Sequence, residues 1–143
     1  MLIEQAFTLT DELLDALTRL IPQLKISSPR LTPDGLAGLL ASDATSLLTA
    51  RDGTGVIVGM LTLVHYRTPN GVRARIEDVV VDESARGQGI AVELVQRALS
   101  IAREKGADGA ALTSNPRREA ANRLYQKMGF KLWETNVYFY KFE

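Results

Sequence analysis

Two kinds of hydrophobic pattern alternate along the chain, and together they predict a sheet flanked by helices. Apolar residues spaced by three and four predict helices, whereas short apolar or alternating runs between turn residues predict strands. The resulting order is β-α-α-β-β-β-α-β-α-β-β, typical of an α/β (α+β) protein with a mixed, mostly antiparallel, twisted sheet of about seven strands and about four helices. Strands are expected at residues 2–7, 45–51, 55–67, 72–81, 109–113, 131–135 and 136–142, and helices at 11–24, 33–41, 88–105 and 115–128.

Capping and turn residues support these boundaries. Thr10 and Thr32 stand where N-caps are expected, and Pro33 follows at the first helical position. Asn70-Gly71 tolerates the positive φ angles of a tight turn, and therefore predicts a hairpin between the third and fourth strands.

Composition narrows the class of protein. The 143 residues suit a single domain over 1–143, and 17 basic residues balance 17 acidic ones, so no strongly basic field predicts nucleic-acid binding. With no cysteine and one histidine, His65, the chain lacks the residues for disulfides, Cys/His zinc sites or a thiolate nucleophile, and we expect no bound metal. The longest apolar run is too short to cross a bilayer and no secretory signal is evident, so we expect no membrane partner and a cytoplasmic location.

The stretch VVVDESARGQGIA, residues 79–91, leads from an apolar strand into a helix through Arg-Gly-Gln-Gly. Unpaired N–H groups at a helix N-terminus favour phosphate, and glycine allows a ligand to approach the backbone closely. A plain structural turn, a dinucleotide-binding turn and a cradle for another pyrophosphate are the alternatives. The dinucleotide motif fits poorly, because Val92 takes the place of its third glycine and Asp108 precedes the next strand instead of following it.

A second motif lies about thirty residues further on. The turn Arg86-x-x-Gly89-x-Ala91, followed by Leu124-Tyr125-x-x-x-Gly129-Phe130, resembles the GCN5-related N-acetyltransferase (GNAT) superfamily. Its pyrophosphate signature is Q/R-x-x-G-x-G/A, and a later helix commonly reads A-x-x-L-Y-x-x-x-G-F. The resemblance implies the GNAT fold and an acetyl-CoA-dependent N-acetyltransferase acting on an amine.

The resemblance also implies where acetyl-CoA binds. The cofactor would enter a V-shaped opening between strands 79–81 and 110–113, with its pantetheine arm along Val79, Val80 and Val81. Backbone groups of the turn would hold the pyrophosphate: Arg86, Gly87, Gln88, Gly89, Ile90 and Ala91. Many members carry Asn where this chain has Arg118, which makes Arg118, with Asn115 and Asn122 beside it, the candidates for that cofactor contact.

Catalytic residues follow from the resemblance and from the chemistry. Tyr125 matches the family tyrosine that is thought to protonate the departing thiolate. The amine must lose a proton, and a strand carboxylate is the natural base. Strand alternation sends Glu77 and Asp78 to opposite faces, so one of them should face the substrate; we favour Glu77, acting through water, with Asp78 next.

The sequence does not decide whether the acceptor is a small primary amine or a peptide or protein amine. A homodimer is possible. Residues ARIEDVVVD resemble the corresponding strand of glucosamine-6-phosphate N-acetyltransferases, but the segment before Tyr125 is longer than in those enzymes. The alternative from another class is a non-catalytic acyl-CoA-binding or interaction module that kept the turn and lost turnover.

Overall fold

The computed structural model describes residues 1–24 and 30–143. They divide into two compact units, Met1–Thr113 and Ser114–Glu143. The first unit contains a sheet with helices α1, α2 and α3, and the second contains helix α4. The expectation of one domain over residues 1–143 stays a prediction.

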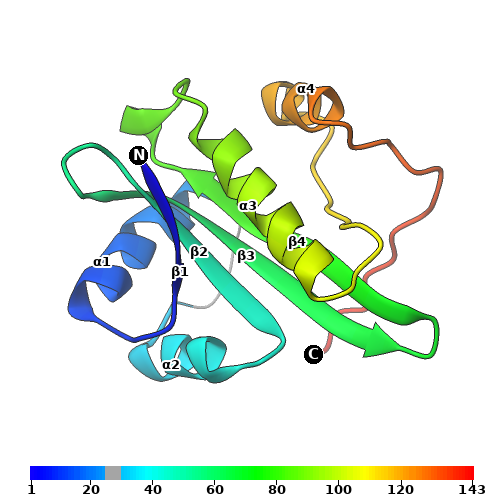
Figure 1. The fold of residues 1–143 in the computed structure, drawn as a ribbon, viewed down its shortest axis with the longest axis horizontal. Coiled ribbons are helices and arrows are strands. Elements are labelled where there is room, and N and C mark those ends of the chain that lie inside the picture. The colour runs from blue at the N-terminus through cyan, green and yellow to red at the C-terminus, as the bar shows by residue number, and fades with distance from the viewer. Residues whose placement is uncertain (25–29) are drawn as a thin grey trace. The chain divides into compact units, whose positions relative to one another are not determined.

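Among the described residues, four strands form an antiparallel sheet in the order β1-β2-β3-β4. These strands are β1 (Leu2–Ala6), β2 (Thr45–Arg51), β3 (Ile57–Thr68) and β4 (Gly71–Val81). The hairpin predicted from Asn70-Gly71 joins β3 to β4, with Thr68 paired to Gly71, whose φ is 119°. The two longest strands therefore lie side by side at one edge of the sheet (Figure 1).

Helices cover both faces of this sheet. Helix α1 (Asp11–Leu20) continues as the 3-10 helix η1 (Ile21–Leu24), and α2 is Pro33–Ala41. Thr10 and Thr32 cap α1 and α2 as predicted, because their hydroxyls accept the N–H groups of Leu13 (3.1 Å) and Gly35 (3.0 Å). One core cluster joins these helices to a face of the sheet and contains Leu13, Leu17, Leu20, Leu36, Leu47, Met60 and Val80.

Helix α3 (Ile90–Glu104) packs against the other face. Its apolar stripe is buried, and the N-terminal turn of α3 approaches β3 at Gly59. A Cβ at Gly59 would lie 3.2 Å from both Ile90 Cγ2 and Leu94 Cδ1. A Cβ there would push these side chains aside by a few tenths of an ångström, so glycine suits the close approach of α3 to β3.

The second unit contains α4 (Glu119–Lys127), and the expected strands at 131–135 and 136–142 are absent. The fifth expected strand, 109–113, is reduced to one isolated parallel bridge, Arg75 with Ala111, and a second bridge, Val72 with Ala107, lies just before it. The prediction of about seven strands was therefore too high for the described residues. Alternating apolar residues supply one face of a strand, but a strand also needs a neighbour for its backbone N–H and C=O groups.

In the described residues, no helix combines the length and the apolar character that crossing a membrane requires.

Candidate active site

The outer edge of β4 is paired along its first half only. Ile76 donates its N–H to the carbonyl of Ala111 (2.9 Å), and Ala111 donates to the carbonyl of Ala74 (3.0 Å). Within the described part of the first unit, no bridge continues this pairing beyond Arg75 and Ala111. The following residues of β4, 77–81, therefore form an open strand edge, at the place where the sequence predicted a V-shaped opening.

A β-bulge interrupts β4 in this open part. Thr62 pairs with Glu77 and Met60 with Val80, so Asp78 and Val79 together oppose the single residue Leu61. Asp78 adopts the left-handed conformation in this bulge, with a φ of 52°. It is the one non-glycine residue with positive φ in the described chain. A carboxylate side chain is among those that tolerate this left-handed conformation.

The bulge decides which backbone groups face the open edge. Asp82 donates its N–H inward to the carbonyl of Val58 on β3 (2.8 Å). Because successive residues of a strand alternate, the peptide groups of Val81 and Val79 point outward, away from β3. Without the extra residue the outward set would have included Val80 instead. The expected pattern of simple alternation between Glu77 and Asp78 is therefore replaced by a bulge.

The two candidate carboxylates have different surroundings. Nε of Arg75 lies 2.5 Å from Oε1 of Glu77, and this guanidinium also reaches the hydroxyl of Thr113 (3.4 Å). The Asp78 side chain is exposed, and among the described residues its carboxylate forms no ion pair and no hydrogen bond. Partial desolvation by neighbouring atoms, with the nearby charge of Glu77, raises the pKa of Asp78 above its ordinary value.

The glycine-rich turn connects β4 to α3 through the 3-10 helix η2 (Glu83–Ala85). Gly87 and Gly89 have φ angles of 79° and 78°, and space around both is open. Gly89 is the N-cap of α3 and supplies no side-chain cap. In the part of the chain that the structure describes, the backbone N–H groups of residues 87–91 have no acceptor outside the helix ladder. The turn thus presents several unpaired donors at the positive end of a helix dipole.

Side chains from α1 and η1 hold the start of this turn. Asp82 caps η2 by accepting hydrogen bonds from the N–H (3.1 Å) and hydroxyl (3.0 Å) of Ser84. The same carboxylate pairs with Arg19, which also donates to the carbonyl of Ile57 (2.8 Å), and Gln23 accepts the N–H of Glu83 (3.1 Å). Arg86 donates its Nε to the carbonyl of Val81 (3.2 Å), which links the turn to the open edge.

The other predicted site residues lie in the second unit. Nδ2 of Asn122 donates to the carbonyls of Asn115 (2.9 Å) and Arg118 (2.8 Å), and so ties the segment before α4 to the helix. Tyr125 stacks edge-to-face on Phe130, with ring centroids 5.7 Å apart. Burial raises the pKa of the Tyr125 phenol, while the charge of Arg118 opposes the shift.

The sequence did not reveal how Arg75, Arg19 and Gln23 support the site. The side chain of Arg75 fixes Glu77 through the ion pair described above. The spacing of Arg75 and Glu77, two residues apart on one strand, is a signal that could have indicated this pair. No local signal links Arg19 to Asp82, because 63 positions separate them.

Comparison with known sequences identifies the class of protein that this site belongs to. The sequence model described as "Acetyltransferase (GNAT) family" matches residues 10–130. The chain therefore belongs to the GNAT family of acetyltransferases, as the turn and the Tyr125 motif predicted.

Two curated relatives are similar over part of their length. A glucosamine 6-phosphate N-acetyltransferase of Trypanosoma brucei brucei is 39% identical over 87 residues, covering 59% of this chain and 57% of the relative. An aminoalkylphosphonate N-acetyltransferase of Salmonella typhimurium (strain LT2) is 34% identical over 102 residues, covering 68% and 64%. The aligned region thus spans less than two thirds of either relative.

Solved structures match nearly the whole chain. A Trypanosoma brucei acetyltransferase has a TM-score of 0.75 at 28% identity, covering 97% of this chain and 99% of its own. A glucosamine-6-phosphate N-acetyltransferase from Arabidopsis thaliana has a TM-score of 0.78 at 17% identity, covering 98% and 99%, and at this identity the likeness concerns the fold alone. The α+β GNAT fold is therefore shown, with the four-stranded antiparallel sheet and four α-helices of the described residues.

Proposed function

We propose that this protein is an acetyl-CoA-dependent N-acetyltransferase, which moves an acetyl group directly from the CoA thioester to an amine within a ternary complex. One observation carries the proposal: the open edge of β4 at residues 77–81 is followed, after the short helix η2, by a turn with unpaired N–H groups at residues 87–91. CoA offers the matching chemistry in the same order, since its amide-containing pantetheine arm is joined to a pyrophosphate.

The backbone supports this mode of binding. The outward peptide groups of Val79 and Val81 can pair with the pantetheine amides as a neighbouring strand would. The N–H groups of Gly87, Gln88, Gly89, Ile90 and Ala91 suit the pyrophosphate, and the open space around both glycines leaves room for it. Acetyl-CoA supplies the thioester whose acyl group is transferred.

Asp78 is the better-supported base. An amine attacks a thioester only in its neutral form, so a nearby carboxylate must take its proton. The sequence favoured Glu77, but the Glu77 carboxylate is engaged by Arg75, whereas Asp78 has no such partner among the described residues and has a raised pKa. A raised pKa makes Asp78 a stronger proton acceptor. The sequence suggested the N–H of Val79 or of Val80 for the tetrahedral oxyanion; the Val79 peptide faces the open edge, so its N–H is the better candidate.

Tyr125 is proposed as the acid that protonates the departing thiolate. Burial keeps its phenol protonated at neutral pH, which is the form that an acid must have. Arg118, Asn115 and Asn122 are proposed as further cofactor contacts from the same unit. The hydrogen bonds of Asn122 support a role in shaping the segment that would carry these contacts.

The acceptor is proposed to be a small primary amine or a peptide amine. The names of the two curated relatives indicate amines that carry a phosphate or a phosphonate, so a substrate panel should begin with such compounds. Aliphatic diamines and N-terminal peptides complete the panel. No covalent enzyme intermediate is needed, in keeping with a chain that has no cysteine.

Calorimetric titration with acetyl-CoA, with NAD and ATP as controls, tests the proposal first. Saturable binding of acetyl-CoA but not of the controls is expected, followed by thiol release when an acceptor from the panel is added. Absence of acetyl-CoA binding by folded protein would overturn the proposal. Binding without turnover on any amine would favour the second candidate, a non-catalytic acyl-CoA-binding module.

A further inference from the structure

A cavity of about 300 Å³ lies at the end of α3 that is remote from the glycine-rich turn. Lys105 follows the last residue of α3, whereas the turn precedes its first residue. A helix of 15 residues is about 22 Å long, so the cavity and the turn are separate places on the first unit. The volume is at the lower limit for small-molecule sites, which suits a small ligand.

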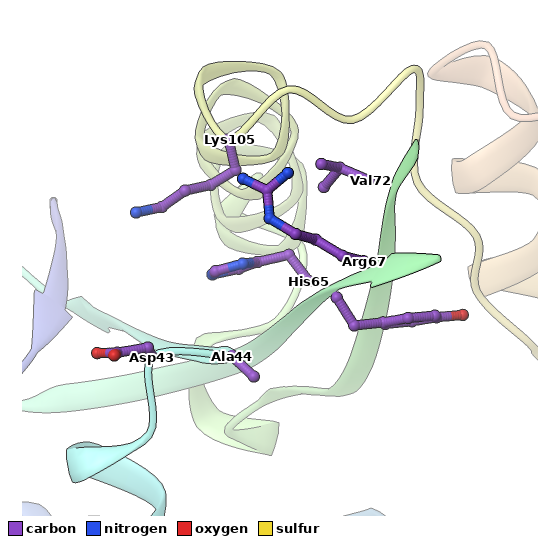
Figure 2. A pocket seen from close by; sticks show the side chains of 7 residues that line it. Asp43, Ala44, His65, Arg67, Val72 and Lys105 are labelled. Atoms are coloured by element: carbon purple, nitrogen blue, oxygen red, sulfur yellow. The ribbon is translucent and has the colours of Figure 1, made fainter. Parts of the chain in front are cut away.

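Basic side chains dominate this cavity. Figure 2 shows Lys105 extending from the end of α3, His65 and Arg67 from β3, and Asp43 from the segment before β2. A smaller neighbouring cavity of about 160 Å³ shares Asp43, His65 and Lys105. The charged or titratable side chains lining the two cavities are therefore one carboxylate, the exposed phenol of Tyr66 and three basic groups.

The basic groups lack counter-ions within the protein. Elsewhere in the first unit, Arg19, Arg51 and Arg75 pair with carboxylates, whereas the exposed Arg97 and Arg103 form no ion pair with a described residue but do not line either cavity. Among the described residues, neither Arg67 nor Lys105 forms an ion pair, and Asp43 does not approach either of them or His65 within 4.0 Å. Cations that converge on a cavity without a protein counter-ion form an environment that favours an anion.

The end of α3 does not oppose an anion strongly. A helix C-terminus repels negative charge through its unpaired carbonyl groups. Here the carbonyls of Ile101, Ala102 and Arg103 already accept N–H groups from Lys105, Ala107 and Gly106, at 3.0 Å each. Three of the last carbonyl groups of α3 are thus paired within the chain.

We propose that this cavity is a second binding site, distinct from the acetyl-transfer site, for a small phosphate-type anion held by Arg67, Lys105 and His65. The ligand is either free phosphate or the phosphate group of a small monoester. Arg67 and Lys105 supply charge-assisted donors, and His65 adds a third when it is protonated. Asp43, which also lines the cavity, repels an anion and so limits its affinity.

His65 reports on this site by itself, because it is the single histidine of the chain. Desolvation, followed by the charge of Lys105, lowers its pKa, whereas Asp43 raises it. An anion bound beside the ring favours the protonated form and raises the pKa. Binding and protonation are linked, so affinity rises as the pH falls through the pKa of His65 in the complex.

The test is an NMR pH titration of the His65 ring in the full chain. Inorganic phosphate, glycerol 3-phosphate and sodium chloride are compared at equal ionic strength. Phosphate or the monoester is expected to raise the His65 pKa by about one unit relative to chloride. A larger response to one of the two phosphates identifies the source of the anion. Identical titrations in phosphate, monoester and chloride would overturn the proposal.

Matched variants locate the effect. Arg67→Gln and Lys105→Gln should each reduce the phosphate-induced shift at least threefold, and Asp43→Asn should increase the affinity. Arg97→Gln removes the same charge from an exposed position on α3 and should leave the shift unchanged. A full response in both Arg67→Gln and Lys105→Gln would contradict the proposal. Gly89→Ala should retain the His65 response, so the result does not depend on acetyl-CoA binding.

Discussion

Nη1 of Arg19 lies 2.5 Å from Oδ2 of Asp82, although 63 positions of the chain separate the two residues. Arg19 belongs to α1, and Asp82 is the N-cap of the 3-10 helix that precedes the glycine-rich turn. The pair therefore fixes the turn to a helix on the opposite side of the sheet from α3. Supports of this kind position the backbone donors of the turn before any ligand binds.

Arg19→Gln should lower the free energy of unfolding by about 1 kcal/mol, because it removes a surface ion pair and the hydrogen bond to Ile57. Chemical denaturation measures the change. Arg123→Gln makes the same substitution at an exposed pair, 4.0 Å from Glu119, and should cost less than about 0.5 kcal/mol. Equal losses in the free energy of unfolding would show that the Arg19–Asp82 pair stabilises the fold no more than an ordinary surface ion pair.

The stabilising effect of Asp82 should depend on pH in the acid range. Hydrogen bonds from Ser84, then the Arg19 interactions, hold the pKa of Asp82 below its ordinary 3.8. Its contribution is therefore complete above pH 3.8 and is lost as the pH falls through the lowered pKa of the folded state. Comparison of wild type with Asp82→Asn should show a stability difference that shrinks over this interval. A difference that stays constant through the acid range would contradict the assignment.

Asp78→Asn should lower kcat between about 10²- and 10⁴-fold if Asp78 is the base. Asparagine also tolerates the positive φ at this position, so the fold and acetyl-CoA binding should be retained. Glu77→Gln, the matched control, should reduce kcat far less. The acid limb of the wild-type pH–rate profile should lie above pH 3.8, since the pKa of Asp78 is raised and the protonated form is inactive. A larger loss of kcat in Glu77→Gln than in Asp78→Asn would instead identify Glu77 as the base.

Gly89→Ala should weaken acetyl-CoA binding by at least about tenfold, because a left-handed conformation costs a residue with Cβ about 1–2 kcal/mol and the turn would shift to relieve it. Gly106→Ala imposes a similar conformational cost beyond the other end of α3, where φ is 92°. That control should lose stability without losing affinity. Calorimetry with acetyl-CoA separates the two results, and unchanged affinity in Gly89→Ala would remove the turn from the cofactor site.

Tyr125→Phe should reduce turnover at least about tenfold while acetyl-CoA affinity stays nearly unchanged, since only the proton donor is removed. The edge-to-face contact with Phe130 is preserved in this variant. Steady-state kinetics and calorimetry on the same preparation measure both quantities. Equal turnover in mutant and wild type would exclude the phenol from the mechanism.

Most of the first unit could be predicted from local patterns. The caps at Thr10 and Thr32, the hairpin at Asn70-Gly71 and the helix after Gly89 depend on neighbours in sequence, and the structure confirms all four. The expected strands at 131–135 and 136–142 would need a neighbouring strand from a distant part of the chain. The alternation of apolar and polar residues does not show whether such a neighbour is present.

The site was predicted less completely than the fold. The motif indicated the turn, and the need for a base on the preceding strand indicated both carboxylates; their roles stay predictions. The bulge was not predicted, because it depends on how Asp78 and Val79 oppose Leu61 on the neighbouring strand. The pairing of Arg75 with Glu77 likewise depends on side-chain geometry, and it changes which carboxylate is the stronger candidate for the base.

The half-open edge of β4 also bears on aggregation. An unpaired strand edge can recruit a strand from another molecule and begin aggregation. In β4 the bulge at Asp78 breaks the regular spacing of hydrogen-bonding groups, and charged side chains at Arg75, Glu77 and Asp78 flank the break. Both features discourage a second protein strand, whereas a slender ligand with few amides needs only the short stretch around Val79 and Val81. The bulge at Asp78 therefore disfavours pairing with a second protein strand while leaving the edge available to the ligand that we propose.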